Sequence, residues 1–224
     1  EEDALPGLVE AYSDLWRKYD AGVLFVNDGS RDGTLTMVKS ICDKNEKFGY
    51  LNLSRNYGKE QAIAAGLSAI PEGQNLILID GDGQHTPDAV SKLITALDED
   101  AEADMAFGVR ETRAYQGALD RFFSVAFYKT VNKMMRHNID NRLGDFFVAR
   151  AEIVPVLKQF TDSKLFWKGV YSWVGFTRAI VPIEIKDRDA GTSKFSFFKK
   201  MALAIDGIVW LTKFPLHLIS IIGL

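Results

Sequence analysis

The sequence of 224 residues is poor in cysteine and histidine, and this scarcity argues against several kinds of site. Its one cysteine, Cys42, has no partner for an internal disulfide and does not suffice for a cysteine-built zinc site. The three histidines, His85, His137 and His217, do not have the spacing of a metal-ligand set. The acidic first residues lack the basic start and apolar run of an export signal, so we expect a reducing, cytoplasmic setting.

The net charge of −3 is small and gives no reason to expect a nucleic-acid partner. Charges are nevertheless unevenly distributed along the chain. Residues 98–104 hold five acidic side chains, whereas residues 108–136 hold six Lys or Arg against two acidic side chains. With 47% hydrophobic and 25% charged residues, the composition is that of a folded chain with one large core.

A long uninterrupted apolar run is also missing. Residues 201–224 become steadily more apolar, but Asp206 and Lys213 interrupt them, so they lack the roughly 20 clean apolar residues of a spanning helix. Two interpretations stay open: a buried C-terminal helix, or an interfacial helix that leads into a membrane segment. We favour the second, because Trp210, Lys213 and His217 suit a headgroup zone.

Short apolar segments alternate with helical patterns in the first half of the chain. Strands that are nearly continuous in apolar residues are predicted at 22–27, 48–53, 74–80 and 103–109. Helices are predicted at 33–46, 58–70 and 87–99. This alternation is typical of an α/β fold with a mainly parallel sheet and helices on both faces.

Polar side chains directly follow three of these strands. The segments are Asn27-Asp28-Gly29-Ser30, Ser54-Arg55-Asn56 and Asp80-Gly81-Asp82-Gly83-Gln84. Ligands of parallel sheets bind beyond the carboxyl ends of the strands, so we expect the three segments to converge on one cleft. A plain turn remains the alternative for each segment, because Asn, Asp, Gly and Ser are turn formers.

Two common loop motifs do not fit these segments. A calcium loop that starts at Asp80 would need Gly at its sixth position and Glu at its twelfth, where His85 and Ser91 stand. A phosphate-binding P-loop would need Ser or Thr after Lys59, but Glu60 follows it.

Two carboxylates separated by one glycine instead suit Mg²⁺. This ion takes one or two protein carboxylates and completes its shell with water and substrate phosphates. We therefore predict that Asp82 and Gln84 face a cation held by a nucleotide diphosphate, and that Asp80 supports them or contacts the ribose.

Seven segments also carry a family resemblance. They are NDGSRDGT, LSRNYGKEQAIAAGL, LIDGDGQHTPDAV, GVR followed by RFFSVAFYKTVN, GDFFVAR, WVGF and RDAGTSKFSFFKKMALAIDGI. In this order they resemble the family-two glycosyltransferases. The similarity is greatest to the polyprenyl-phosphate branch, which includes dolichol-phosphate mannosyltransferases and bacterial bactoprenol glucosyltransferases, and it covers nearly the whole chain.

The resemblance implies a GT-A (Rossmann-like) fold and metal-dependent, inverting transfer of a hexose from a nucleotide-diphosphate sugar to a polyprenyl phosphate, with Mg²⁺ or Mn²⁺ as cofactor. It assigns the metal to Asp80, Asp82 and Gln84. It assigns the nucleotide sugar to Asp28, which contacts the base, and to Ser30, Arg55, Lys59, Asp80 and Asp82. It assigns the acceptor phosphate to Arg110, Arg121, Ser124 and Lys194. The implied catalytic residues are Asp82, Asp145 and Arg188.

The matching positions also suggest finer roles. Arg188 and Lys194 resemble the basic pair of a loop that closes over the site, and Asp145 resembles a carboxylate near the sugar. A turn or capping role remains the alternative for Asp145. Residues 117–135 have a helical apolar stripe, with Arg121 elsewhere on the helix, and Arg121 beside Ser124, one turn apart, suits an anion. For Lys129 and Lys133 we favour an ordinary solvated basic face.

The resemblance divides the chain into a catalytic domain at 1–195 and an amphipathic juxtamembrane segment at 196–224. The family's opening strand has no counterpart before EEDALPGL, and we expect that this strand is missing from the sequence. Membrane attachment with the active site on the cytoplasmic face, and an assembly of several copies, are implied as well.

Alternative functions stay open beside this one. They are a glycosyltransferase that acts on a polysaccharide or protein, a sugar nucleotidyltransferase, and a nucleotide-sugar-binding module without catalysis.

A lipid-phosphate acceptor needs no strong general base, because a phosphate monoester has a second pKa near ~6 and is largely anionic at neutral pH.

Overall fold

The computed structural model describes residues 2–110, 132, 140, 142–160 and 166–184. Four predicted site residues lie outside this part of the chain: Arg121, Ser124, Arg188 and Lys194. The segment 196–224 and nearly all of the helix predicted at 117–135 lie outside it as well. Among the described residues, no helix has the length and apolar character needed to span a bilayer.

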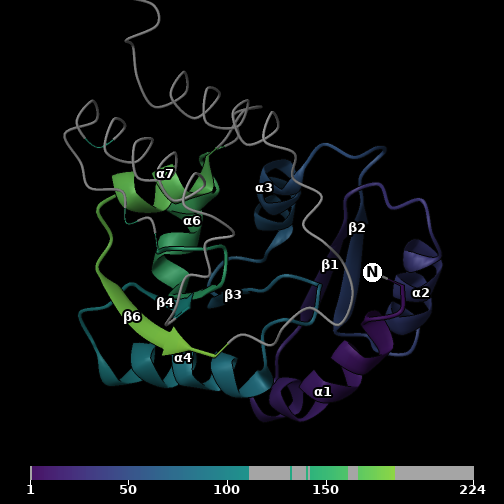
Figure 1. The fold of residues 1–224 in the computed structure, drawn as a ribbon, viewed down its shortest axis with the longest axis horizontal. Helices are drawn as coiled ribbons and strands as arrows, with labels where there is room; N and C mark the ends of the chain where they lie inside the picture. Colours follow the sequence, from purple (N-terminus) through teal and green to yellow (C-terminus); the bar gives the residue numbers. More distant parts are fainter. Residues whose placement is uncertain (1, 111–131, 133–139, 141, 161–165, 185–224) are drawn as a thin grey trace, which may run out of the picture.

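The first half of the chain alternates helices and strands, as its sequence predicts (Figure 1). In chain order these elements are α1 (Leu5–Lys18), β1 (Val23–Asn27), α2 (Thr34–Cys42), β2 (Phe48–Asn52), α3 (Lys59–Ala69), β3 (Leu76–Leu78), α4 (Pro87–Glu99) and β4 (Met105–Arg110). The described residues further along form β5 (Phe147–Ala149), a 3₁₀ turn (Ala151–Ile153), α6 (Val154–Leu157), α7 (Trp167–Trp173) and β6 (Arg178–Ile183).

The strands form two sheets. β1 and β2 pair in parallel, with Val23 opposite Phe48 and Asn27 opposite Asn52. The other sheet has the order β3-β5-β4-β6, in which β4 and β6 are parallel and β5 runs antiparallel to both of its neighbours. The α/β class with parallel strands is therefore confirmed, and β5 is an antiparallel addition that the sequence patterns did not predict.

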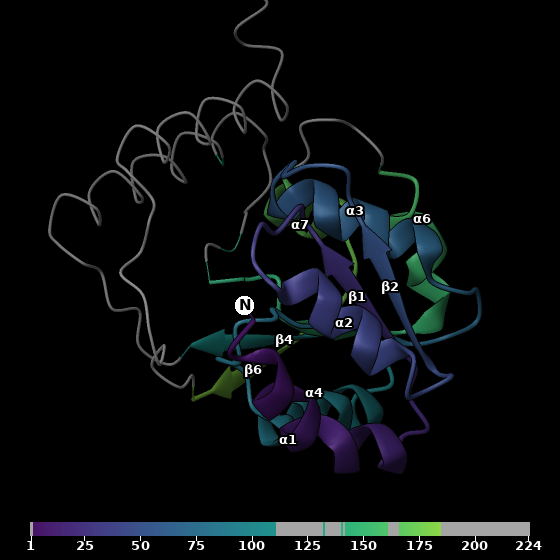
Figure 2. The same ribbon diagram turned by 90° about the vertical axis from the view of Figure 1, so that its right-hand side faces the viewer.

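Both sheets are covered by helices. α2 and α3 flank the β1–β2 pair on opposite sides, as Figures 1 and 2 both show. α3 lies so close to β1 that a Cβ atom added to Gly66 would stand 3.1 Å from a methyl carbon of Val26. In the four-stranded sheet, α4 lies on one face and α6 and α7 on the other (Figure 1).

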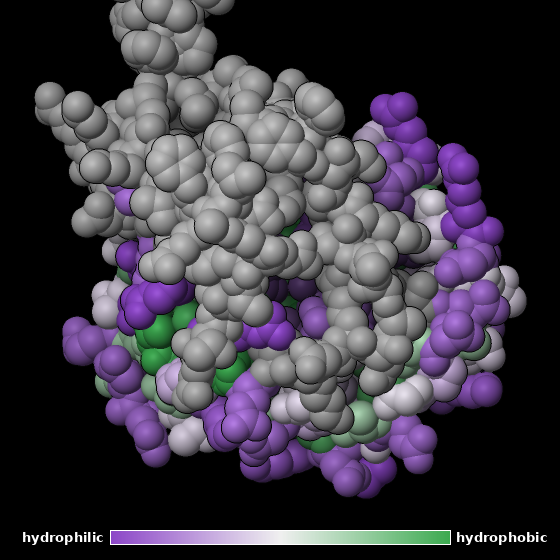
Figure 3. Space-filling model, viewed as in Figure 1, coloured by the Kyte–Doolittle hydropathy of each residue, from purple (hydrophilic) through white to green (hydrophobic). Residues whose placement is uncertain are grey.

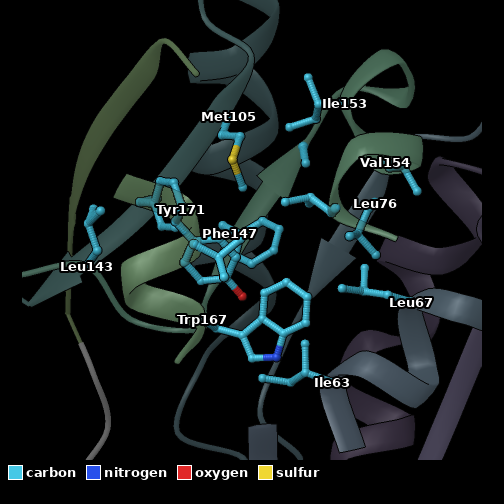
Figure 4. Close-up of a cluster of buried hydrophobic side chains, with 14 residues drawn as sticks. Ile63, Leu67, Leu76, Met105, Leu143, Phe147, Ile153, Val154, Trp167 and Tyr171 are labelled. Carbon is cyan, nitrogen blue, oxygen red and sulfur yellow. The ribbon is translucent and has the colours of Figure 1, made fainter. Parts of the chain in front are cut away.

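Alternation along β4 and β5 divides the core into two clusters. Met105 and Phe107 of β4 point to the side of α3, α6 and α7, whereas Ala106 between them points to α1 and α4. Phe147 and Val148 of β5 separate in the same way. The first cluster is rich in aromatic rings (Figure 4), and full burial of each large side chain stabilises the fold by about 1.5–3 kcal/mol.

On the face shown in Figure 3, most of the described surface that is visible is hydrophilic, with small hydrophobic areas between. Most of the buried apolar side chains among the described residues belong to the two clusters.

Candidate active site

The loop after β1 is tied to the loop after β2 through Asp28. The Oδ1 atom of Asp28 accepts a hydrogen bond from the backbone N–H of Tyr57 (2.7 Å), and Oδ2 accepts one from Gly58 (2.9 Å). The side chain of Asn56 donates to the backbone oxygen of Asp28 (3.1 Å). Gly58 has a φ of 95°, a backbone conformation that favours glycine. The predicted base contact is therefore also a structural anchor of the turn before α3.

A glycine allows the two loops to approach each other. Gly29 has a φ of 66°, and a Cβ atom added there would stand 2.4 Å from the carbonyl carbon of Arg55. Ser30 and Arg55 both line a pocket of about 360 Å³ at the ends of β1 and β2. The guanidinium of Arg55 lies over the ring of Tyr57, 4.7 Å from its centroid. The structure thus brings together two of the predicted nucleotide-sugar contacts.

The residue after this turn, Lys59, connects three loops. Its Nζ atom lies 2.7 Å and 2.9 Å from the two carboxylate oxygens of Asp80, which follows β3. The same atom lies 2.9 Å from Oδ2 of Asp145, which precedes β5. The consecutive residues Gly58 and Lys59 thus bind the aspartates that follow β1 and β3.

Lys59 carries a stable charge at this position. Burial disfavours the charged amine, but the nearby carboxylates of Asp145 and Asp80 outweigh that effect, so the pKa of Lys59 is raised above its usual value. The side chain of Asp145 is 11% exposed against 37% for Asp80. Asp145 is therefore an interior partner of Lys59.

The loop after β3 brings Asp82 and Gln84 into one turn. The backbone N–H of Gln84 donates to Oδ1 of Asp82 (3.1 Å). The turn ends at Thr86, whose hydroxyl accepts a hydrogen bond from the N–H of Ala89 (3.2 Å) and caps α4. Within the described part of the chain, no three His, Cys, Asp or Glu side chains are grouped as a complete metal site.

That finding is compatible with Mg²⁺ or Mn²⁺. Such ions need only one or two protein carboxylates when substrate phosphates and water supply the other ligands. Asp82 offers a carboxylate and Gln84 an amide oxygen in the same turn, and Asp80 stands two residues earlier. The donor set is made of hard oxygen atoms, which fits a hard divalent cation.

His85 lies at the same loop, and its spacing from the other histidines predicted no metal-binding role for it. Its ring stacks on Phe146 at a centroid distance of 3.9 Å and an angle of 11°. Burial lowers the pKa of His85, although Asp80 and Asp82 act in the opposite direction. A Cβ atom added to Gly108 would stand 2.3 Å from a ring carbon of Phe146, so the glycine in β4 makes room for this stack.

Of the four predicted acceptor contacts, only Arg110 is among the described residues. It is exposed, and it is the last residue of β4, opposite Ile183 of β6. The carboxyl end of β4 is the position at which a parallel sheet binds its ligands.

Residues 1–157 match the sequence profile of glycosyl transferase family 2, and the chain belongs to this family. It is 35% identical over 227 aligned residues to a bactoprenol glucosyl transferase of Shigella phage SfX, covering 100% of this chain and 73% of that protein. A prophage bactoprenol glucosyl transferase homolog of Escherichia coli (strain K12) is 34% identical, with the same coverage.

A solved structure supports the fold. The crystal structure of mannosyl-3-phosphoglycerate synthase from Rubrobacter xylanophilus superposes with a TM-score of 0.56 at 14% identity, over 92% of this chain and 68% of that one. The predicted family, the GT-A fold and the predicted class of enzyme are therefore confirmed.

Proposed function

We propose that this enzyme transfers a hexose from a nucleotide-diphosphate sugar to a polyprenyl phosphate, and that the hexose is glucose. The observation that carries the proposal is the similarity along the full chain to proteins named bactoprenol glucosyl transferase. The convergence of loops at the strand ends supports it, since Lys59 joins Asp80 and Asp145 one residue after the turn that holds Asp28.

The donor site in this proposal lies between the loops after β1, β2 and β3. Asp28, Ser30 and Arg55 contact the nucleoside; Asp28 can do so while it holds the turn, because a carboxylate has about four acceptor positions. Lys59 contacts the diphosphate and keeps Asp80 in place.

Asp82 and Gln84, supported by Asp80, hold Mg²⁺ or Mn²⁺. When bound, the ion stabilises negative charge on the departing nucleoside diphosphate as a Lewis acid. The protein's own contribution is to fix these oxygen ligands in one turn, beside the ammonium group of Lys59. Replacement of Asp82 should therefore lower the rate of transfer from the donor more than it lowers the stability of the fold.

The acceptor site needs cations. We assign the lipid phosphate to Arg110, Arg121, Ser124 and Lys194, with Arg188 on the loop that closes over the site. The phosphate attacks the anomeric carbon in one displacement that inverts its configuration, and the bond from that carbon to the diphosphate oxygen breaks. Asp145, fixed by Lys59, orients a sugar hydroxyl or the acceptor.

A lipid acceptor implies work at a membrane surface. Anionic headgroups attract Lys and Arg at roughly 1 kcal/mol per residue, which fits the basic stretch at 108–136. We propose that residues 196–224 lie along the membrane, that the active site faces the cytoplasm, and that several copies assemble.

One assay tests the function. Purified protein with Mg²⁺ is given labelled nucleotide sugars that differ in base and sugar, with and without undecaprenyl phosphate in detergent. We expect lipid-extractable sugar from a glucose donor only when the lipid is present. Transfer to a polysaccharide or protein without lipid would support the non-lipid alternative, and release of pyrophosphate would indicate a nucleotidyltransferase. Donor binding without turnover under all conditions would refute the enzyme's proposed reaction.

A further inference from the structure

Glu60 follows Lys59 directly, and its contacts lead away from the donor loops. Its Oε2 atom accepts a hydrogen bond from the backbone N–H of Trp167 (3.0 Å). Its backbone oxygen accepts a second one from the indole N–H of the same residue (2.9 Å). One residue of α3 thus holds the first residue of α7, although 107 positions separate them in the sequence.

α7 brings a buried tyrosine toward the site. Trp167 and Tyr171 stand one helical turn apart, and their rings stack at a centroid distance of 5.7 Å. Both side chains are completely buried and belong to the aromatic cluster of Figure 4, in which Tyr171 also contacts Phe147, at 5.0 Å between ring centroids. The position of Tyr171 is therefore set by the packing of α7.

The hydroxyl of Tyr171 belongs to the electrostatic surroundings of the site. Burial raises the pKa of this phenol well above its usual value, and Asp145, Glu60 and Asp80 raise it further, in that order. The hydroxyl therefore stays protonated. Tyr171 Oη and Asp145 Oδ1 are both buried, and neither has a hydrogen-bond partner among the residues that the structure describes.

Buried polar atoms normally have hydrogen-bond partners. Leaving these two atoms without one therefore costs free energy, unless a bound ligand supplies the partner. Lys59 holds one oxygen of Asp145 and leaves the other inside the site. We infer that Glu60 is a positioning residue for sugar transfer: it anchors α7 to α3 directly beside Lys59, the residue that holds Asp145. This inference rests on the proposed function.

The charge of Glu60 adds to its effect. Burial first, and Asp145 second, raise the pKa of Glu60 to about 7, whereas the N–H of Trp167 and the lysines at 59 and 168 act in the opposite direction. Above that pH a second carboxylate competes with Asp145 for Lys59. Activity should therefore fall as Glu60 loses its proton.

The test compares three variants of the full chain. Glu60→Gln keeps an acceptor for the Trp167 N–H without the charge, Glu60→Ala removes both, and Glu10→Ala is the control on an exposed position of α1. Hydrogen exchange of the peptide that covers α7 reports the anchoring, and kcat and donor KM from pH 6 to pH 8 report the transfer.

We expect faster exchange in α7 for Glu60→Ala only. We also expect its kcat to fall about tenfold with little change in donor KM, and Glu60→Gln to restore most of that loss. The ratio of wild-type kcat to Glu60→Gln kcat should fall roughly threefold between pH 6 and pH 8.

Unchanged exchange in α7 of Glu60→Ala would overturn the anchoring. Faster exchange with unchanged kcat, or a ratio that does not vary with pH, would overturn the role in transfer. Absence of transfer by the wild-type protein on every donor would instead refute the proposed function, and the exchange data would still decide whether Glu60 holds α7.

Discussion

Aspartates follow the ends of β1 and β3 and both contact the start of α3, but they are held in different ways. Asp28 after β1 is bound by two backbone N–H groups, which cannot leave unless the turn changes its conformation. Asp80 after β3 is bound by the flexible side chain of Lys59, which also serves Asp145. The first arrangement depends on the backbone of the turn, whereas the second depends on a side chain that can rotate away.

The largest expected effect concerns Asp82, in the loop after β3. Asp82→Ala should lower metal-dependent transfer by about 100-fold or more, because it removes a carboxylate ligand, while thermal unfolding stays close to that of the wild-type protein. Asp88→Ala is the matched control, since Asp88 is exposed on α4 and pairs with Lys92 one helical turn away. Turnover of Asp82→Ala at the level of this control would show that Asp82 does not serve the reaction.

The next effect compares Asp28 with Asp80. Asp28→Ala leaves two backbone N–H groups without their acceptor and should lower the free energy of unfolding by about 2 kcal/mol. Asp80→Ala breaks a half-exposed ion pair and should lower it by less than about 1 kcal/mol. Urea unfolding measures the free energy of unfolding of both variants. Equal losses would contradict the stronger structural role of Asp28.

A third variant tests the proposed acceptor-phosphate site separately from the loops after β1 and β3. Arg121→Ala should raise the KM for polyprenyl phosphate about tenfold, because a charge-assisted contact to phosphate is lost, with donor KM unchanged. Steady-state kinetics with each substrate varied in turn check this. A change in donor KM alone would mean that the lipid phosphate binds elsewhere.

The smallest effect is a dependence of stability on pH. The pKa of Glu60 is raised from 4.5 to about 7 in the folded protein, so its contribution to stability is complete below pH 4.5 and is lost as pH rises through 7. Glu60→Gln lacks this loss. The wild-type free energy of unfolding should therefore fall by about 1 kcal/mol relative to this variant between pH 6 and pH 8, and parallel curves would contradict the burial of a protonated Glu60.

Local patterns in the sequence predicted the elements that form locally. β1, β2 and β4 and helices α2, α3 and α4 lie where apolar periodicity placed them, and β3 is shorter than predicted because its partner β5 has three residues. β5 has no such signal. Its residue Ala149 pairs with Leu76 and Met105, which are far from it in the sequence, so the pairing is decided by tertiary packing.

The candidate site shows the same limit. The rule that ligands bind at strand ends predicted one cleft for Asp28, Asp80 and their loops, and the structure links the two aspartates through the consecutive residues Gly58 and Lys59. The rule does not say which groups hold them: the two N–H groups before α3, the double ion pair of Lys59 and the contacts of Glu60 with Trp167 depend on residues up to 107 positions apart. The Gly58-Lys59-Glu60 segment carried a signal, since glycine before a helix permits an unusual φ, but only the fold shows where its side chains point.

Binding of Mn²⁺ tests the central claim most directly, because it needs no knowledge of the acceptor. The electron paramagnetic resonance signal of free Mn²⁺ is followed while wild-type protein, Asp82→Ala or Asp88→Ala is added, with and without a nucleoside diphosphate. We predict that the wild-type protein and Asp88→Ala bind the ion when the diphosphate is present and that Asp82→Ala does not. Equal binding by Asp82→Ala would contradict a metal held at the turn after β3.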